Sequence, residues 1–464
     1  MKIYDIAVIG GGPAGYVAAI KGAQLGASVI LFEQDVLGGT CLNRGCIPTK
    51  SYLKTAEYIH NIRRAKERGI HLASTEFTVS MDEVVSNKNR VVKQLTGGVA
   101  GLLRAHGVEV VRGTAHLLTE TKIACGDKTY EAKHILLCGG SKAGLLPIPG
   151  AENNPDVITS DEILDLTTLP KALTVIGGGV VGCEMASAFR AFGTEVTIVE
   201  LTDRLVGMLD ADISNELKKA LENQGVCVLT SQKVRKIGKQ GGTAAVFLEG
   251  EPNPIPADKI LLSIGRFSDL ACLGELRGKI RVENGKVVVD DYMRTNIPNI
   301  YAPGDINGRM MLAHAAFKMG ETAAMNAVGR SEKCDLSHVP GCLYTLPEAA
   351  SVGLTEEAAG KTHDIAVGRF PLNANGRALA SGEPEGFVKV VIDKTYGEIL
   401  GVHIVGGMAT EMIGEAVALM AMEITAHEAA DIIHAHPSFS EAFMEAAADA
   451  LGRCIHLPPK RQTP

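Results

Sequence analysis

The sequence contains no tryptophan, and only 4% of its 464 residues are aromatic. No uninterrupted apolar run approaches the ~20 residues that a membrane-spanning helix needs. The net charge is −7, so there is no excess of basic residues to form a nucleic-acid-binding face. Low-complexity segments are also lacking. These absences argue against a membrane protein, a general nucleic-acid binder and a disordered chain.

The cysteine content argues against a secreted protein. Ten cysteines in a chain of this length do not make the dense disulfide framework of small secreted domains. The N-terminal run IAVIGGGPAGYVAAI has the apolar character of a signal peptide, but three glycines and a proline interrupt it and no small-residue cleavage site follows. We therefore expect a cytoplasmic protein.

The chain does contain an internal repeat. Residues 4–33 and 172–200 each read as an apolar strand, a G-x-G-x-x-G loop, an alanine-rich helix and a second strand that ends in glutamate. The first glycine of the loop precedes that glutamate by 23 residues in both copies. This pattern is typical of two βαβ units.

Each repeat predicts a dinucleotide site. The first glycine permits a tight turn, the second lets the backbone approach a pyrophosphate, and the third lets helix and strand pack closely. The phosphates meet free N–H groups at the start of the helix, and the glutamate accepts hydrogen bonds from a ribose. Two turns that bind nothing are the less favoured alternative. The candidate residues are Gly10, Gly12, Gly15 and Glu33 in the first loop, and Gly177, Gly179, Gly182 and Glu200 in the second.

The second site is expected to prefer NAD. The carboxylate of Glu200 would repel the 2′-phosphate of NADP. Arg204 lies nearby and could in principle bind that phosphate, but we expect it to be solvated.

The remaining pattern predicts the other elements. Residues 51–69 read as a helix, 108–111 and 134–138 as strands, and 144–155 as a connection between domains. An Asn-Gly pair within 280–290 predicts a hairpin with a type I′ turn. From about residue 340 the alternation indicates an antiparallel sheet followed by helices. The length is sufficient for about three domains.

Two cysteines, Cys41 and Cys46, lie five residues apart in CLNRGC. On an ideal helix their Cα atoms would be about 8.6 Å apart, whereas a disulfide needs roughly 4.4–6.8 Å. A disulfide therefore requires a break in the helix, which Gly45 and Pro48 could supply. A short distorted loop of this kind suits a disulfide that opens and closes in turnover. Two coincidental thiols or half of a metal site are the alternatives, although C-x₄-C does not match the usual zinc spacing.

These motifs, together with YAPGD at 301–305 and HPSFSE at 436–441, occur in the order found in pyridine nucleotide–disulfide oxidoreductases. The chain resembles that family over essentially its whole length, and most of all its members that oxidise dihydrolipoyl groups. The resemblance implies an α/β fold with two Rossmann-like dinucleotide-binding domains and a C-terminal α+β dimerisation domain. The implied boundaries are an FAD-binding domain at 1–148, an NAD-binding domain at 149–272, a central domain completing the FAD site at 273–338, and the interface domain at 339–464.

The resemblance also implies catalytic roles. Cys41 is expected to attack the substrate and Cys46 to face the flavin. Lys50 is expected to pair with Glu184 beside the flavin, although their sequence positions alone favour a solvent-facing lysine and a helix-surface glutamate. A base near the thiols would speed exchange.

That base is expected to be His436, which the family places at the active site of the partner subunit. Glu441 would orient its imidazole. Ser438 and Glu441 also match a capping box, and one carboxylate has lone pairs enough for both tasks. His434 could suggest a metal site, a reading we disfavour because no companion ligands lie nearby.

Further cofactor contacts follow from the resemblance. They are Gly39, Thr40, Gly113, Asp305 and Ala313 for FAD, and Val234 and Gly265 for NAD. Two segments depart from the family pattern. Residues 136–141 read LLCGGS where an ATG segment is usual, and residues 265–269 read GRFSD where GRxPN is usual.

The expected activity is oxidation of a protein-bound dihydrolipoyl group, with FAD as relay and NAD⁺ as acceptor. The expected partners are a second copy of the chain and a lipoyl-bearing protein of a 2-oxoacid dehydrogenase or glycine-cleavage type complex. An NADPH-dependent reductase of a glutathione-like disulfide is a rival that Glu200 opposes. A mercuric-ion reductase would carry a C-terminal cysteine pair, whereas Cys454 stands alone. A redox sensor that binds FAD without turnover remains a further alternative.

Overall fold

The computed structural model describes residues 2–74, 76–145 and 147–459. Its first sheet has the order β3-β2-β1-β6-β5-β4, with β19 added against β6. The strands β3, β2, β1, β6 and β19 run parallel, and β4 and β5 complete the sheet as antiparallel strands. The bounds are β1 Ile3–Ile9, β2 Val29–Glu33, β3 Glu109–Arg112, β4 Ala115–Leu117, β5 Lys122–Cys125, β6 Lys128–Leu137 and β19 Ile300–Tyr301.

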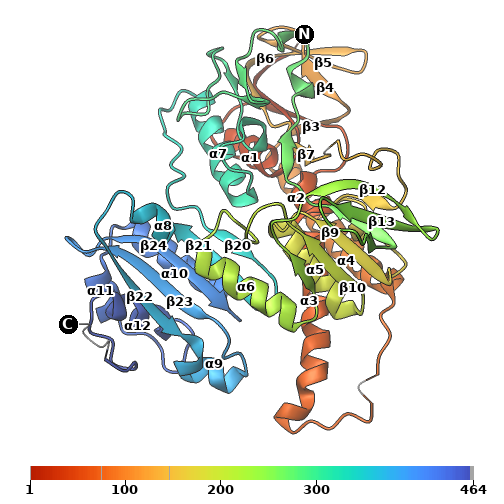
Figure 1. Ribbon diagram of the computed structural model, residues 1–464. Coiled ribbons are helices and arrows are strands. Elements are labelled where there is room, and N and C mark those ends of the chain that lie inside the picture. Colours follow the sequence, from red (N-terminus) through yellow and green to blue (C-terminus); the bar gives the residue numbers. More distant parts are fainter. Residues whose placement is uncertain (1, 75, 146, 460–464) are drawn as a thin grey trace.

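The second repeat forms a second parallel sheet, in the order β11-β10-β9-β15-β8. A small antiparallel sheet, β12-β13-β14, lies beside it. The two repeats are thus two Rossmann-like units, as predicted (Figure 1). The bounds are β8 Val157–Ile158, β9 Ala172–Ile176, β10 Glu195–Val199, β11 Cys227–Leu229, β12 Val234–Gln240, β13 Thr243–Leu248, β14 Ile255–Pro256 and β15 Lys259–Leu262, with helices α5 Val180–Phe192 and α6 Ala211–Asn223.

The chain leaves the second unit and returns to the first. The strands β7 (Ser141–Ala143) and β16 (Arg266–Ser268) pair antiparallel where the two units join. After the short helix η3 (Ala271–Leu276), the hairpin of β17 (Val282–Glu283) and β18 (Lys286–Val287) turns through Asn284 and Gly285, both with positive φ, which confirms the type I′ turn. The helix α7 (Ala313–Ala327) then packs beside α1 (Pro13–Gln24), as Figure 1 shows.

The C-terminal part is an antiparallel sheet, β20-β21-β24-β23-β22, covered by helices. It forms the blue, separate lobe in Figure 1 and confirms the expected α+β domain. The bounds are β20 Gly341–Leu343, β21 Glu348–Gly353, β22 Ile365–Pro371, β23 Phe387–Asp393 and β24 Ile399–Gly406, with α8 Glu356–Ala359, η5 Leu372–Ala374, α9 Gly376–Ser381, α10 Ala409–Ala421, α11 Ala426–Asp431 and α12 Glu441–Ala450.

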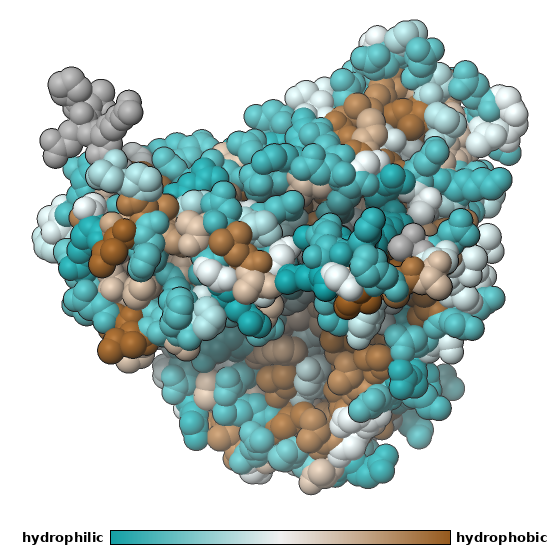
Figure 2. Space-filling view, turned by 90° about the horizontal axis from the view of Figure 1, so that it is seen from below, coloured by the Kyte–Doolittle hydropathy of each residue, from teal (hydrophilic) through white to brown (hydrophobic). Residues whose placement is uncertain are grey.

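Helix α10 buries its apolar side within its own domain. Met412, Ile413 and Met420 pack into the core formed with the sheet. Exposed hydrophobic side chains of this domain lie both before the helix and beyond it, and they include Leu379, Tyr396, Met422, Ile433 and Ile455. On the face of the molecule that Figure 2 shows, hydrophobic residues form brown patches among hydrophilic ones. The apolar stripe of α10 is therefore covered by the sheet of its own domain.

Helices α2, α3 and α4 extend from the first unit. Helix α2 covers Gly39–Arg44 and α3 covers Cys46–Arg64, followed by η1 at Ala65–Arg68 and the left-handed Gly69, where the predicted helix ends. Helix α4 (Met81–Ala105) packs against α3. The short helices η2 (Ile163–Asp165) and η4 (Asp305–Asn307) complete the list. None of the helices in the described part of the chain has the length and hydropathy of a membrane span.

A buried ion cluster joins the second unit to the C-terminal domain. Lys389 Nζ on β23 lies 2.9 Å from Asp210 Oδ1, 2.9 Å from Asp212 Oδ2 and 2.6 Å from Glu356 Oε2. The side chains of Lys389 and Asp210 are only 3% and 2% exposed. Backbone N–H groups of Asp212 and Glu356 also donate to Asp210. Lys389 therefore supplies the buried positive charge that balances the negative charge of Asp210.

We expect Lys389→Met to destabilise the folded chain by roughly 3 kcal/mol, because it leaves the buried Asp210 charge without its cation. Thermal unfolding of the FAD-loaded protein measures the change. The control is Lys394→Met, which removes an exposed lysine 2.7 Å from Asp364 and should cost less than about 1 kcal/mol. Equal shifts in Tm for the two variants would contradict this prediction.

Candidate active site

The two cysteines lie on either side of a break between helices. Cys41 is in α2 and Cys46 is the first residue of α3, with Gly45 (φ −141°, ψ −112°) between the helices. A Cβ atom at Gly45 would lie 3.0 Å from the carbonyl oxygen of Thr40, so a side chain would crowd the break. The sequence prediction that the backbone leaves a regular helix here is confirmed.

The break lets the two sulfurs interact. Both cysteines are free thiols in this structure, and Cys41 donates a hydrogen bond to Cys46. That hydrogen bond, together with the positive charge of Lys50, lowers the pKa of Cys46 to about 7 against the effect of burial. The same hydrogen bond and burial raise the pKa of Cys41. The thiolate of the reduced pair therefore resides on Cys46.

Lys50 lies one helical turn after Cys46 and forms a buried ion pair with Glu184 on α5. Its Nζ lies 2.9 Å from Oε1 and 3.0 Å from Oε2 of Glu184. The Glu184 residue is only 2% exposed, and a buried carboxylate requires such a partner. The reading that sequence position alone favoured, a helix-surface glutamate with a solvent-facing lysine, is wrong.

Tyr344 contacts both members of this pair. The Nζ atom of Lys50 lies 4.3 Å from the centroid of the tyrosine ring. The backbone N–H of Tyr344 donates to Glu184 Oε1 at 3.0 Å. Sequence reasoning missed this residue, because nothing in its own neighbourhood marks it and its partner lies 160 residues away.

The two glycine loops have the same internal hydrogen bond. Glu33 Oε2 accepts from the N–H of Gly11 at 2.7 Å, and Glu200 Oε2 accepts from the N–H of Gly178 at 2.6 Å. The carboxylate of each glutamate therefore lies against its glycine loop, at the position where the sequence predicts the ribose.

The glycines of the loops fall into two kinds. Gly10 and Gly177 both have φ of 106°, and a Cβ at Gly15 or Gly182 would lie within 2.1 Å of the carbonyl oxygen of the first glycine of its loop. The second glycines differ. A Cβ at Gly179 would meet no atom within 4 Å, and one at Gly12 would meet only Gly39 Cα at 3.7 Å. The second glycines thus border open space, as a pyrophosphate site requires.

Other predicted FAD contacts gather around the first loop. A Cβ at Gly39 would lie 2.6 Å from Gly12 Cα, so the start of α2 meets the loop. The N–H of Gly113 donates to the carbonyl oxygen of Glu33 at 2.8 Å. Ala313 begins α7, which packs against α1.

A polar network surrounds Asp305. Ser141 Oγ donates to Asp305 Oδ2 at 2.6 Å, and Arg266 Nε donates to Ser141 Oγ at 2.8 Å. Arg266 also reaches Thr40 Oγ1 at 3.3 Å. Ser141 and Arg266 come from the two segments that depart from the family pattern, and they were not among the predicted site residues. The sequence did carry a signal for these two residues, because each lies in a segment that departs from the family pattern. The structure brings the two segments together through the hydrogen bond between Arg266 and Ser141.

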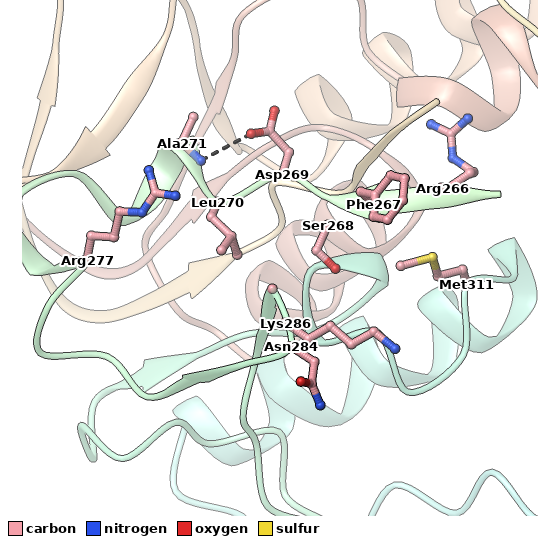
Figure 3. A pocket seen from close by; sticks show the side chains of 11 residues that line it. Arg266, Phe267, Ser268, Asp269, Leu270, Ala271, Arg277, Asn284, Lys286 and Met311 are labelled. Carbon is pink, nitrogen blue, oxygen red and sulfur yellow. Dashed lines mark hydrogen bonds between the residues drawn. The ribbon is translucent and has the colours of Figure 1, made fainter. Parts of the chain in front are cut away.

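A pocket of about 320 Å³ opens beside this network (Figure 3). Its walls include Arg266, Phe267 and Ser268 on β16, with Lys286 and Met311 opposite. Met311 lies two residues before Ala313. One wall of the pocket is therefore formed by the segment just before Ala313, a predicted flavin contact.

The predicted NAD residues flank the second loop. The N–H of Gln232, two residues before Val234, donates to the carbonyl oxygen of Glu200 at 2.9 Å. Ser263, two residues before Gly265, donates through Oγ to the carbonyl oxygen of Gly177 at 2.7 Å. Arg204 was expected to be solvated. Its side chain is 33% exposed, and its Nη2 lies 3.6 Å from Oε2 of the exposed Glu357.

His436 and Glu441 form a pair, as predicted. His436 Nδ1 lies 2.9 Å from Glu441 Oε1, and the N–H of Ser438 donates to Oε2 of the same glutamate at 2.8 Å. Burial opposes ionisation of Glu441, but these hydrogen bonds outweigh it and hold its pKa below the ordinary value. The predicted capping box does not form, because the N-cap of α12 is Ser440 and Ser438 Oγ makes no hydrogen bond among the described residues.

The imidazole of His436 is largely exposed to solvent. Its side chain is 78% exposed, and Figure 1 shows α12 in a different lobe from α2 and its cysteine. His434 is engaged elsewhere, with Nε2 2.6 Å from Glu415 Oε1. No cluster of metal-ligating residues occurs within the part of the chain that the structure describes.

Comparison with known proteins agrees with this arrangement. Residues 4–320 match the family model of the pyridine nucleotide-disulphide oxidoreductases, and residues 339–447 match the dimerisation domain of that family. A dihydrolipoyl dehydrogenase of Bacillus subtilis is 40% identical over 97% of this chain and 99% of its own length. One from Thermus scotoductus is 40% identical over 98% and 99%, respectively. Among solved structures, LpdA from Mycobacterium tuberculosis has a TM-score of 0.87 at 27% identity, covering 95% of this chain and 98% of its own.

Proposed function

The chain belongs to the pyridine nucleotide-disulphide oxidoreductase family, and on this premise we propose that it is a dihydrolipoyl dehydrogenase. It oxidises dihydrolipoamide to lipoamide and passes the electrons to NAD⁺. The single observation that carries the proposal is the pair of cysteines on either side of the break at Gly45, one helical turn from the Lys50–Glu184 ion pair. Relatives of that name, 36–40% identical over nearly the whole chain, support the choice of substrate.

The first loop fits FAD. Open space lies beside Gly12, and Glu33 lies where a ribose would bind. Arg266 connects Thr40 with Ser141, which in turn donates to Asp305. When bound, FAD supplies the two-electron chemistry that links the protein dithiol with NAD⁺. The second loop fits NAD⁺. Glu200 would repel a 2′-phosphate. Arg204 lies 3.6 Å from Glu357 in a surface ion pair.

The thiol chemistry proceeds by exchange. In the oxidised protein, a substrate thiolate attacks the Cys41 sulfur, the bond between Cys41 and Cys46 breaks, and Cys46 leaves as a thiolate. The second substrate thiol then attacks the sulfur that is bound to Cys41. This step forms the lipoyl disulfide and releases Cys41, which takes up a proton.

The side chains around the pair assist both steps. The ammonium group of Lys50 stabilises the departing Cys46 thiolate. His436 of the partner subunit removes the protons of the substrate thiols, and Glu441 of that subunit holds its imidazole. The exposed position of His436 and the match of residues 339–447 to a dimerisation domain support a homodimer that shares each active site between subunits.

The physiological substrate is a lipoyl group carried on a protein. We propose a lipoyl-bearing component of a 2-oxoacid dehydrogenase or glycine-cleavage type complex as the partner.

A turnover assay tests the function. The FAD-loaded protein is expected to reduce NAD⁺ with free dihydrolipoamide at least about tenfold more efficiently than NADP⁺. Glutathione disulfide with NADPH is expected to give no significant turnover. Rapid glutathione reduction by NADPH would overturn the substrate assignment. Stable FAD binding without any turnover would favour the redox sensor.

A further inference from the structure

The ion pair beside Cys46 is held from the C-terminal domain. Tyr344 follows β20, which belongs to the sheet of that domain, whereas Lys50 and Glu184 lie on α3 and α5. The ring of Tyr344 contacts the ammonium group, and its backbone N–H contacts the carboxylate. One residue therefore touches both charges from outside the two dinucleotide-binding units.

The contact between the Tyr344 ring and the Lys50 ammonium group is close enough to help fix the position of the lysine. A cation within about 6 Å of an aromatic centroid gains roughly 0.5–2 kcal/mol, with the larger values where water is excluded. Lys50 lies well inside that range at 4.3 Å, and its side chain is only 31% exposed. Burial raises the pKa of Tyr344 to about 12, so the phenol stays neutral at working pH.

Lys50 and Glu184 have opposite effects on the pKa of Cys46. Its positive charge lowers the pKa of Cys46, while the negative charge of Glu184 raises it. Without the ring, the ammonium group of Lys50 keeps its ion pair with Glu184 but loses the second contact that fixes its position. The lysine is then freer to move away from Cys46 toward solvent. The ionisable groups that face this centre are Cys41 on α2, Tyr16 on α1, Lys50 on α3, Glu184 on α5, Cys342 on β20, Glu348 on β21 and Glu411 on α10.

We propose that Tyr344 is a positioning residue, whose ring and backbone N–H hold the Lys50–Glu184 ion pair in place beside Cys46. The C-terminal domain thereby sets the reactivity of a thiol in the first unit. The proposal rests on the proposed function only in taking Cys46 as the thiolate of the reduced pair.

The test follows the ionisation of Cys46 rather than turnover. In a Cys41→Ser background, the FAD-loaded protein is alkylated with iodoacetamide over a pH series, and the rate at Cys46 is normalised to its high-pH plateau. Tyr344→Leu removes the ring but keeps the backbone N–H. We expect its normalised rate at pH 7 to fall about three- to tenfold, because loss of the nearby positive charge raises a thiol pKa. Tyr344→Phe keeps the ring and should retain the parent profile.

A double-mutant comparison shows whether the effect passes through Lys50. Lys50→Met alone should move the profile in the same direction and at least as far. Adding Tyr344→Leu to Lys50→Met should then change nothing further. An unchanged profile in Tyr344→Leu, or an equal shift in the absence of Lys50, would overturn the proposal. Since no dihydrolipoamide is used, failure of the turnover assay would leave this result standing.

Discussion

Cys46→Ser is expected to lower kcat for dihydrolipoamide oxidation by NAD⁺ by about 10⁴-fold or more, the scale seen when a catalytic nucleophile is removed. Serine cannot form the disulfide with Cys41, and an alkoxide is a poor leaving group in place of the Cys46 thiolate. Steady-state assays of the FAD-loaded variant measure the loss. Cys227→Ser is the matched control, since Cys227 is exposed on β11 and should be replaceable without effect.

The pH dependence of the wild-type pair adds a second check. Because the pKa of Cys46 is lowered to about 7, its thiolate should predominate above neutral pH in the reduced protein and disappear as the pH falls below 7. Iodoacetamide labelling should therefore reach half of its plateau near pH 7. Retention of substantial lipoamide activity by Cys46→Ser, or a labelling midpoint at the ordinary thiol value near 9, would refute the assigned role.

His436→Gln is expected to reduce kcat/KM by roughly 10²–10⁴-fold, the usual contribution of a general base. Glutamine preserves hydrogen bonding but cannot accept the proton of a substrate thiol. The defect should be smallest at high pH, where the substrate thiols ionise unaided. Ser438→Ala is the control, because its hydroxyl makes no hydrogen bond among the described residues and lies two residues away.

Hybrid dimers test whether the histidine acts across the interface. Dissociating and reassociating equal amounts of Cys46→Ser and His436→Gln should restore about one quarter of wild-type activity, because half of the dimers then carry one intact site. If each chain instead used its own histidine, the mixture would stay as inactive as its two parents.

Local patterns predicted the parts of the structure that local geometry determines. Gly10 and Gly177 adopt the same positive φ because the same turn follows the same kind of strand. Asn284 and Gly285 form the expected hairpin turn for a similar reason. The break at Gly45 was expected because a disulfide across five residues cannot fit a regular helix. In each case the determining residues lie within a few positions of one another.

Contacts between distant segments were not predictable in the same way. The burial of Glu184 depends on Lys50 and Tyr344, which come from two other elements. The cluster around Lys389 joins β23 to the start of α6 and has no sequence motif. The apolar stripe of α10 predicts a buried face but not whether its own sheet or a second chain covers it. Only the assembled fold decides these points.

The interruption at Gly45 has one more consequence, which concerns the electric field of the backbone. By starting a 19-residue helix at Cys46, it sets that sulfur at the positive end of the peptide dipoles, where an anion is favoured by roughly 0.3–1 kcal/mol. Cys41, in a six-residue helix on the other side of the break, has no comparable support. The path of the main chain therefore makes Cys46 easier to ionise than Cys41. Exchanging the catalytic roles of the two cysteines would require moving Gly45 and not merely altering the neighbouring side chains.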